Sequence, residues 1–320
     1  MQTLVEIFGS RVQFDVPMRE HTTLGIGGPA RAMIAVRSED EIARAISLAQ
    51  EAGLPHLLIG GGSNLLVADE GTEHLVIKNE YVGIRRRGNA VFVKSGTRLQ
   101  TLVDYTVEKG LTGLHRLTGV PGTVGGAVFG NAGAYGQTIS DHLEEVIYFD
   151  GRKIRRVQAS DFRFGYRWSA FKETHYAILS VKLNLESADR ATLAGEYAEV
   201  MAKRLAKYPV GLRCPGSFFM NVLAGTLPPE VLQLIPPDKV LYGKIPAGYL
   251  LEQVGAKGDA RGGIQIAATN ANLFMNMGDG TAVDFLQLAG EYARRVNERY
   301  GIELHPEVQF VNLPLFSTSS

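Results

Sequence analysis

The sequence predicts an α+β protein built from two parts. In the first part, apolar strand-like runs such as 30–36 alternate with segments of helical periodicity. In the second part, a strongly capped helix begins at Thr281 and is followed by the apolar segment 301–313. A polar helix start follows Leu185. We therefore expect one domain over residues 1–187 and a second over residues 188–320 that ends in a short tail.

The elements are expected in a regular order. A strand at 30–36 precedes a helix with a capping box of Ser38 and Glu41, which Gly53 ends. The remaining helices are expected at 98–110, 187–209 and 281–301. The remaining strands are expected at 54–60, 74–79, 90–96, 176–185 and 301–313, with a hairpin over 144–158 that turns at Asp150-Gly151.

Composition excludes several classes of function. The 33 basic side chains equal the 33 acidic ones, so no basic surface for nucleic acid is indicated and an anionic ligand needs local groups. The single cysteine, Cys214, excludes an internal disulfide and a cysteine-rich metal site, and we interpret it as a small filler. The histidines show no metal-ligand spacing, so we expect no metal. No secretory signal or long apolar span is found, which predicts a cytoplasmic protein without membrane insertion.

Three glycine clusters are candidates for ligand binding. The first, GIGGPA at 25–30, has the spacing of a nicotinamide-dinucleotide motif, but that motif must open a helix, and here Pro29 leads into a strand. The second, GGGSN at 60–64, follows a strand directly. Consecutive glycines let backbone N–H groups converge on an anion, whereas the alternative is a tight turn.

The third cluster, PGTVGGAVFGNAGAYG at 121–136, carries no charged side chain and is too rich in glycine for an ordinary helix or strand. It predicts a place where a flat ring or a diphosphate lies against the main chain, with Asn131 and Tyr135 bonding its edge. The alternative is a close crossing of two elements. Two such loops in one domain indicate a dinucleotide ligand.

Six segments in this order resemble the UDP-N-acetylenolpyruvoylglucosamine reductase family: TTLGIGGPA, IGGGSN, GVPGTVGGAVFGNAGAYG, FGYRWSAFK, PGSFFMN and LHPEVQF. The resemblance spans about residues 22–310. It implies an FAD-binding fold of the vanillyl-alcohol-oxidase/p-cresol-methylhydroxylase type, with two α/β subdomains and a C-terminal α+β substrate domain. The short segment between Tyr197 and Gly216 is similar to the family type that lacks a long tyrosine-bearing loop.

The resemblance also implies an activity. NADPH reduces a non-covalently bound FAD, and the reduced flavin then converts UDP-N-acetylglucosamine enolpyruvate to UDP-N-acetylmuramate for peptidoglycan. We expect this nucleotide sugar to be the substrate, and we expect the protein to be a monomer. The two glycine-rich loops are then expected to hold FAD, through Gly60, Gly61, Gly62, Ser63, Asn64, Pro121, Gly122, Thr123, Gly125, Gly126, Ala127, Asn131, Gly133, Ala134 and Tyr135.

The resemblance assigns the chemistry to Arg167, Ser217 and Glu307. An arginine meets a carboxylate bidentately, a glutamate shares a proton or hydrogen bond with it, and a serine hydroxyl delivers a proton. Taken singly, each residue has a simpler explanation: Arg167 as part of a surface ion pair, Ser217 as a turn residue and Glu307 as a solvated side chain. The intact family pattern around all three favours the functional interpretation. Substrate or cofactor contacts are also expected from three further residues, Tyr166, Lys172 and Asn221.

Two departures and two rival functions stay open. Met220 stands where the family commonly has Lys or Arg, and Asn270 where it commonly has His, which affects the expected contacts with the substrate diphosphate. The rivals are another FAD-dependent oxidase of this fold, acting on a small alcohol or sugar, and a non-catalytic nucleotide-binding module. Such an oxidase does not need Arg167, Ser217 and Glu307, and a binding module shows no turnover.

Overall fold

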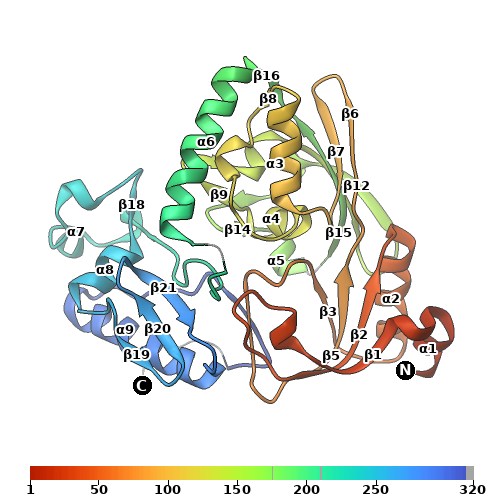
Figure 1. Ribbon diagram of the computed structural model, residues 1–320, viewed down its shortest axis with the longest axis horizontal. Helices are drawn as coiled ribbons and strands as arrows, with labels where there is room; N and C mark the ends of the chain where they lie inside the picture. The colour runs from red at the N-terminus through yellow and green to blue at the C-terminus, as the bar shows by residue number, and fades with distance from the viewer. Residues whose placement is uncertain (175, 210, 315–320) are drawn as a thin grey trace. The chain divides into compact units, whose positions relative to one another are not determined.

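The computed structural model describes residues 1–174, 176–209 and 211–314 (Figure 1). Contacts divide the chain into two compact units. Unit 1 comprises Met1–Val16, Ala30–Gly62 and Glu73–Val210, and unit 2 comprises Pro17–Pro29, Ser63–Thr72 and Gly211–Ser320. The boundary after residue 187, which we expect to separate the FAD-binding domain from the substrate domain, stays a prediction. The tail expected at the C-terminus lies outside the described residues.

The first layer of unit 1 is a four-stranded sheet in the order β1-β2-β5-β3. Its parallel pair β3–β5 places Ile59, the last residue before the glycine-rich loop at 60–64, opposite Lys78. The strands are β1 Val12–Pro17, β2 Pro29–Val36, β3 His56–Ile59 and β5 Thr72–Asn79, and the accompanying helices are α1 Gln2–Phe8 and α2 Glu39–Glu51.

Helix α2 begins as predicted but without the full capping box. The Ser38 hydroxyl accepts the Glu41 N–H at 3.1 Å. The Glu41 carboxylate does not return this bond to Ser38, because it accepts the Arg37 N–H at 2.7 Å and pairs with Arg11 at 2.9 Å. The predicted stop is confirmed, since Gly53 has a left-handed φ of 61°.

The second layer of unit 1 is a five-stranded antiparallel sheet in the order β12-β11-β15-β7-β6. The predicted hairpin is confirmed: the Asp150 carboxylate accepts the N–H groups of Arg152 and Lys153 at 2.8 and 2.7 Å. Helix α6 lies beside α3 (Figure 1). The bounds are β6 Ile84–Arg87, β7 Ala90–Lys94, β11 Leu143–Phe149, β12 Ile154–Gln158, β15 Ala177–Asn184, α3 Leu99–Glu108 and α6 Arg190–Lys207.

Unit 2 has a three-stranded sheet, β19-β20-β21, and a parallel pair of β4 and β22. Helix α9 has the predicted capping box of Thr281 and Asp284 and ends at Gly301. The bounds are β4 Leu65–Val67, β19 Ala260–Arg261, β20 Ile264–Ala267, β21 Asn270–Asn276, β22 Gln309–Val311, α8 Ala247–Gln253 and α9 Ala282–Tyr300.

The final strand is shorter than predicted. Only Gln309–Val311 form β22, whereas the preceding segment turns toward the backbone of Phe219, with which Pro306 forms an isolated bridge. Proline has no N–H to donate to a continuous ladder, which explains why the strand starts only after it. Glu307 therefore lies just before β22.

Short elements complete the fold. They are η1 Gly9–Arg11, η2 Met18–Glu20, β8 Leu111–Thr112, η3 His115–Leu117, α4 Val124–Gly130, β9 Gly133–Ala134, β10 Gln137–Thr138, η4 Ile139–His142, η5 Ala159–Asp161, β13 Phe164–Gly165, β14 Trp168–Ser169, α5 Phe171–Thr174, β16 Glu186–Ser187, β17 Val222–Leu223, η6 Ala224–Thr226, α7 Pro229–Leu232, η7 Pro237–Lys239 and β18 Lys244–Ile245. Among the described residues, no helix is long and apolar enough to span a membrane.

Candidate cofactor and active site

The long glycine-rich stretch contains a helix, contrary to the sequence-based expectation. Val124–Gly130 form α4, whose first turn is capped by the Thr123 hydroxyl, which accepts the Gly126 N–H at 3.4 Å. Asn131 ends the helix in a left-handed conformation, with φ at 45°. Val124, Ala127 and Val128 are buried along one side, and this packing outweighs the low helix propensity of glycine.

Packing within the chain explains several of these glycines. A Cβ on Gly60 would lie 2.2 Å from the Thr123 hydroxyl oxygen, and one on Gly125 would lie 2.9 Å from Ser95 Cβ. Gly126 is different. It is exposed, and the nearest atom to its Cβ position is the Thr123 hydroxyl oxygen at 3.6 Å, an ordinary contact. The described chain therefore leaves room above Gly126.

Among the described residues, backbone N–H groups without an acceptor lie on the shorter glycine-rich loop, at 60–64. None of the hydrogen bonds of the described chain is donated by the N–H of Gly61 or Gly62, although Gly62 is buried. By contrast, the Val124 and Gly125 N–H groups donate to the carbonyls of Thr97 and Ser95, each at 2.8 Å. A buried N–H without an acceptor is costly, so the shorter loop fits an anionic group such as a phosphate.

Asn64, expected among the donors to this anion, has a different contact. Its amide nitrogen donates to the Glu307 carbonyl at 3.1 Å, and its own carbonyl accepts the Gln309 N–H at 2.9 Å. These two bonds hold the segment that carries Glu307 beside β4 in unit 2. The sequence pattern gave no sign of this second role for Asn64.

Arg167 lies in a tight hairpin of unit 1. Strands β13 and β14 pair through Gly165 and Trp168, so Tyr166 and Arg167 form the turn between them. Arg167 has a φ of 55°, which is uncommon for a residue other than glycine. The Lys172 ammonium donates to the Arg167 carbonyl at 2.9 Å, and the Asn131 amide donates to the Gly165 carbonyl at 2.8 Å.

The same hairpin brings the Arg167 side chain to the glycine-rich stretch. A Cβ on Gly133 would lie 3.3 Å from the Arg167 Nη1 atom, so the guanidinium lies close to the main chain there. The Arg167 Cζ atom lies 5.4 Å from the centre of the Tyr166 ring. The Asn131 side-chain oxygen is buried and has no hydrogen-bond partner among the described residues. A ligand N–H would satisfy that oxygen.

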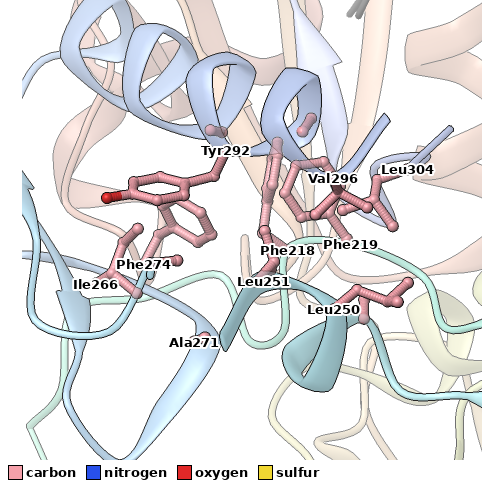
Figure 2. Close-up of a cluster of buried hydrophobic side chains, with 14 of the residues drawn as sticks. Phe218, Phe219, Leu250, Leu251, Ile266, Ala271, Phe274, Tyr292, Val296 and Leu304 are labelled. Carbon is pink, nitrogen blue, oxygen red and sulfur yellow. The ribbon is translucent and has the colours of Figure 1, made fainter. Parts of the chain in front are cut away.

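Ser217 and Glu307 lie on neighbouring segments of unit 2. The Phe218 N–H donates to the Asn272 carbonyl at 3.0 Å, and the Glu307 N–H donates to the Phe218 carbonyl at 2.7 Å. Figure 2 shows Phe218 and Phe219 in the buried cluster with Phe274 and Leu251. Because both rings are anchored there, the backbone that presents Ser217 is fixed.

Asn272 is a supporting residue that sequence reasoning missed. It is buried, and its side-chain oxygen and nitrogen bond the Phe219 N–H and carbonyl, both at 2.8 Å. The signal available in the sequence was an asparagine two residues after the noted Asn270. The amide nitrogen of Asn270 is also buried, and it has no partner within the described chain.

The other predicted positions have structural contacts. The Asn221 side-chain oxygen accepts the Ala247 N–H at 3.2 Å, which caps the start of α8. Burial raises the pKa of the Cys214 thiol, which suits the small filler we expected. A Cβ on Gly28 of the first cluster would lie 2.1 Å from the Asp69 carbonyl oxygen. The cluster leads into β2, so the prediction that a strand and not a helix follows it is confirmed.

Comparison with known proteins first gives the class. Residues 30–152 match the model of an FAD-binding domain, and residues 208–311 match that of the UDP-N-acetylenolpyruvoylglucosamine reductase C-terminal domain. The chain is therefore an FAD-dependent oxidoreductase whose FAD-binding domain is of the vanillyl-alcohol-oxidase type. It belongs to the UDP-N-acetylenolpyruvoylglucosamine reductase family, and acts with FAD and NADPH on the enolpyruvyl nucleotide sugar of peptidoglycan synthesis.

Individual relatives agree over nearly the whole chain. The reductase of Solibacter usitatus is 40% identical over 301 residues, covering 94% of this chain and 96% of its own. That of Desulfosudis oleivorans is 36% identical and covers 97% of each chain. The crystal structure of the Thermus caldophilus reductase has a TM-score of 0.75 at 31% identity, covering 94% of this chain and 99% of its own.

Proposed function

We propose that Arg167, Ser217 and Glu307 perform the second half of the reaction, the reduction of the enolpyruvyl group. FAD, when bound by the two glycine-rich loops and reduced by NADPH, would supply a hydride for the distal alkene carbon of the substrate. Ser217 delivers the proton that the neighbouring carbon needs, so the double bond becomes a saturated lactyl ether. Arg167, through its fixed positive charge, and Glu307, through a hydrogen bond from its protonated carboxyl group, stabilise the negative charge that grows on the substrate carboxylate.

The observation that supports this proposal best is the conformation of Arg167. A left-handed turn costs about 1–2 kcal/mol for a residue other than glycine, and it persists only where its surroundings hold it. Here two side-chain bonds, from Lys172 and Asn131, hold the turn. Such strain is typical of a residue that must be presented in one fixed orientation.

One experiment tests the activity and its rivals together. The purified protein is expected to be yellow, NADPH is expected to bleach its visible flavin spectrum, and the enolpyruvyl nucleotide is expected to restore it. If a small alcohol or sugar bleaches the flavin and oxygen then restores its spectrum, the oxidase is favoured instead. Flavin that NADPH never bleaches would favour a binding module.

FAD binding by the glycine-rich stretch is tested at Gly126. The Gly126→Ala variant is expected to fold normally, because its Cβ meets nothing closer than 3.6 Å, yet to bind FAD about tenfold or more weakly through a clash with the ligand. Gly130→Ala is the matched control on the same helix, since its Cβ has open space, and it should retain FAD. Flavin titration of the apoprotein measures both, and equal affinities would remove Gly126 from the cofactor site.

Lys172 is expected to position Arg167. Replacing it with methionine removes the bond to the Arg167 carbonyl. Loss of this bond should lower the rate of flavin reoxidation at saturating substrate, by up to about 10²-fold if the guanidinium moves by roughly 1 Å. If Lys172 only binds substrate, as the sequence pattern predicts, the KM rises and the saturated rate stays unchanged. Rapid-mixing measurements over a range of substrate concentrations separate these outcomes.

We further propose that the enzyme works as a monomer in the cytoplasm. Support for the cytoplasm comes from the nature of the substrates, because NADPH and nucleotide sugars are made inside the cell. Light scattering across a range of protein concentrations tests the monomeric state, and a dimeric mass at all concentrations would contradict it. Fractionation of cells tests the location in the cytoplasm.

A further inference from the structure

A buried hydrogen bond joins the two sheets of unit 1. Asn79, the last residue of β5, donates from its side-chain nitrogen to the Ser95 hydroxyl oxygen at 2.8 Å. Ser95 directly follows β7 in the second sheet, and both residues are buried. The Asn79 side-chain oxygen also accepts the Tyr81 N–H at 3.0 Å. Both polar ends of the Asn79 side chain are therefore bonded inside unit 1.

On the β5 side, Asn79 stands beside the shorter glycine-rich loop. Lys78 lies opposite Ile59 in the parallel pair β3–β5, and the loop at 60–64 begins directly after Ile59. A Cβ on Gly96 would lie 2.8 Å from the Asn79 side-chain oxygen, so the segment after β7 passes against Asn79 without room for a side chain. Asn79 is thus the contact between the start of this loop and the second sheet.

On the β7 side, Ser95 supports the longer glycine-rich stretch. Its carbonyl accepts the Gly125 N–H at 2.8 Å in the first turn of α4, and its N–H donates to the Leu179 carbonyl at 3.0 Å. A Cβ on Gly125 would lie 2.9 Å from Ser95 Cβ, so the helix packs directly on this residue. The next residue, Gly126, is the one above which the chain leaves room. A movement of Ser95 would therefore move the surface on which FAD is expected to lie.

The bond between Asn79 and Ser95 matters more than an exposed one. If one partner is removed, the other stays buried without a partner, which costs more than the bond contributes when both are present. The segments that it joins would relax around the unpaired group. Glycines have no side chains that could anchor the two loops, so the position of the loops depends on such supports.

We infer that Asn79 is a positioning residue for the cofactor, because its bond to Ser95 fixes the two glycine-rich loops relative to each other before FAD binds. A ligand that meets loops already in place loses no affinity to ordering them. The inference rests on the proposed binding of FAD by both loops. It assigns to Asn79 no contact with FAD and no step of the reaction.

The test measures the FAD affinity and the melting temperature of the apoprotein in Asn79→Ala, Ser95→Ala and the double variant. Each single variant should bind FAD about tenfold more weakly, as loss of one buried hydrogen bond allows. The double variant should bind FAD more tightly than the product of the two single losses predicts, because neither group is left unpaired. Flavin titration well below the melting temperature gives the dissociation constants.

Thr106→Val is the matched control in unit 1. Thr106 is also completely buried, but its hydroxyl donates to the Val103 carbonyl at 2.9 Å within α3, away from both loops. Any loss of stability in this variant should come without a loss of FAD affinity. Equal losses of affinity in Thr106→Val and Asn79→Ala would overturn the inference, because affinity would then simply follow stability.

A purely structural role for Asn79 gives a different result. In that case the melting temperature of Asn79→Ala falls and its FAD dissociation constant stays unchanged, which would also overturn the inference. If Asn79→Ala does not fold, Ser95→Ala decides the question. Failure of the proposed cofactor site would appear elsewhere, since Gly126→Ala would then retain its FAD affinity.

Discussion

Ser217→Ala is expected to divide the two half-reactions. Bleaching of the flavin by NADPH should be nearly unchanged, because hydride entry needs no proton from the chain. Reoxidation by the enolpyruvyl nucleotide should slow by roughly 10²–10⁴-fold, the usual effect of losing a placed general acid. Single-turnover absorbance measurements of each half, with each ligand at saturation, give both rates.

The fold should not suffer from this change. Phe218 and Phe219 are completely buried, and the backbone bonds that fix their segment do not involve the serine hydroxyl. Cys214→Ala is the matched control, because it also removes a small polar group three residues away, and it should leave both rates unchanged. If Ser217→Ala slows both halves equally, the serine positions the cofactor and donates no proton.

Arg167 and Glu307 are expected to act on the same carboxylate. Arg167→Lys should slow reoxidation by roughly 10²–10³-fold, as removal of one oxyanion-stabilising group does, because an ammonium does not reproduce the planar fork. Glu307→Gln keeps a hydrogen-bond donor, so its effect should be milder than that of Glu307→Ala. Since both groups are proposed to contact one carboxylate, the double variant Arg167→Lys/Glu307→Gln should be less impaired than the product of the two single effects.

The measurement is single-turnover reoxidation in the unchanged protein, the two single variants and the double variant. Flavin content and thermal stability serve as controls. The Arg167 turn is held through its carbonyl, and the Glu307 segment through main-chain bonds, so neither substitution should loosen its segment. Strictly multiplicative effects, or weaker nucleotide binding with a normal rate at saturation, would remove both residues from the catalytic set.

Local patterns in the sequence were sufficient for the elements that local interactions stabilise. The cap of α9 by Thr281 and Asp284, the stops at Gly53 and Gly301, and the turn at Asp150 all depend on contacts between residues at most a few positions apart. The glycine content of residues 121–136 likewise indicated, from the sequence alone, that a ligand or another element approaches the backbone closely there. Its family pattern also gave the class of enzyme.

What approaches that backbone was decided only by tertiary structure. The helix over Val124–Gly130 forms because its apolar face is buried, which no propensity scale for glycine predicts. Gly60 and Gly125 are glycines because Thr123 and Ser95 lie against them, and Gly126 alone of these three has room for a side chain. Contacts between residues far apart in the chain depend on the fold, so the sequence pattern does not contain them.

The same reason explains the supporting residues. The bond from Lys172 to the Arg167 carbonyl depends on a left-handed turn, and the bonds from Asn272 to Phe219 join residues 53 positions apart. The sequence determined which residue types are present for the chemistry, and the tertiary structure decided which of them are held, buried or left without an acceptor.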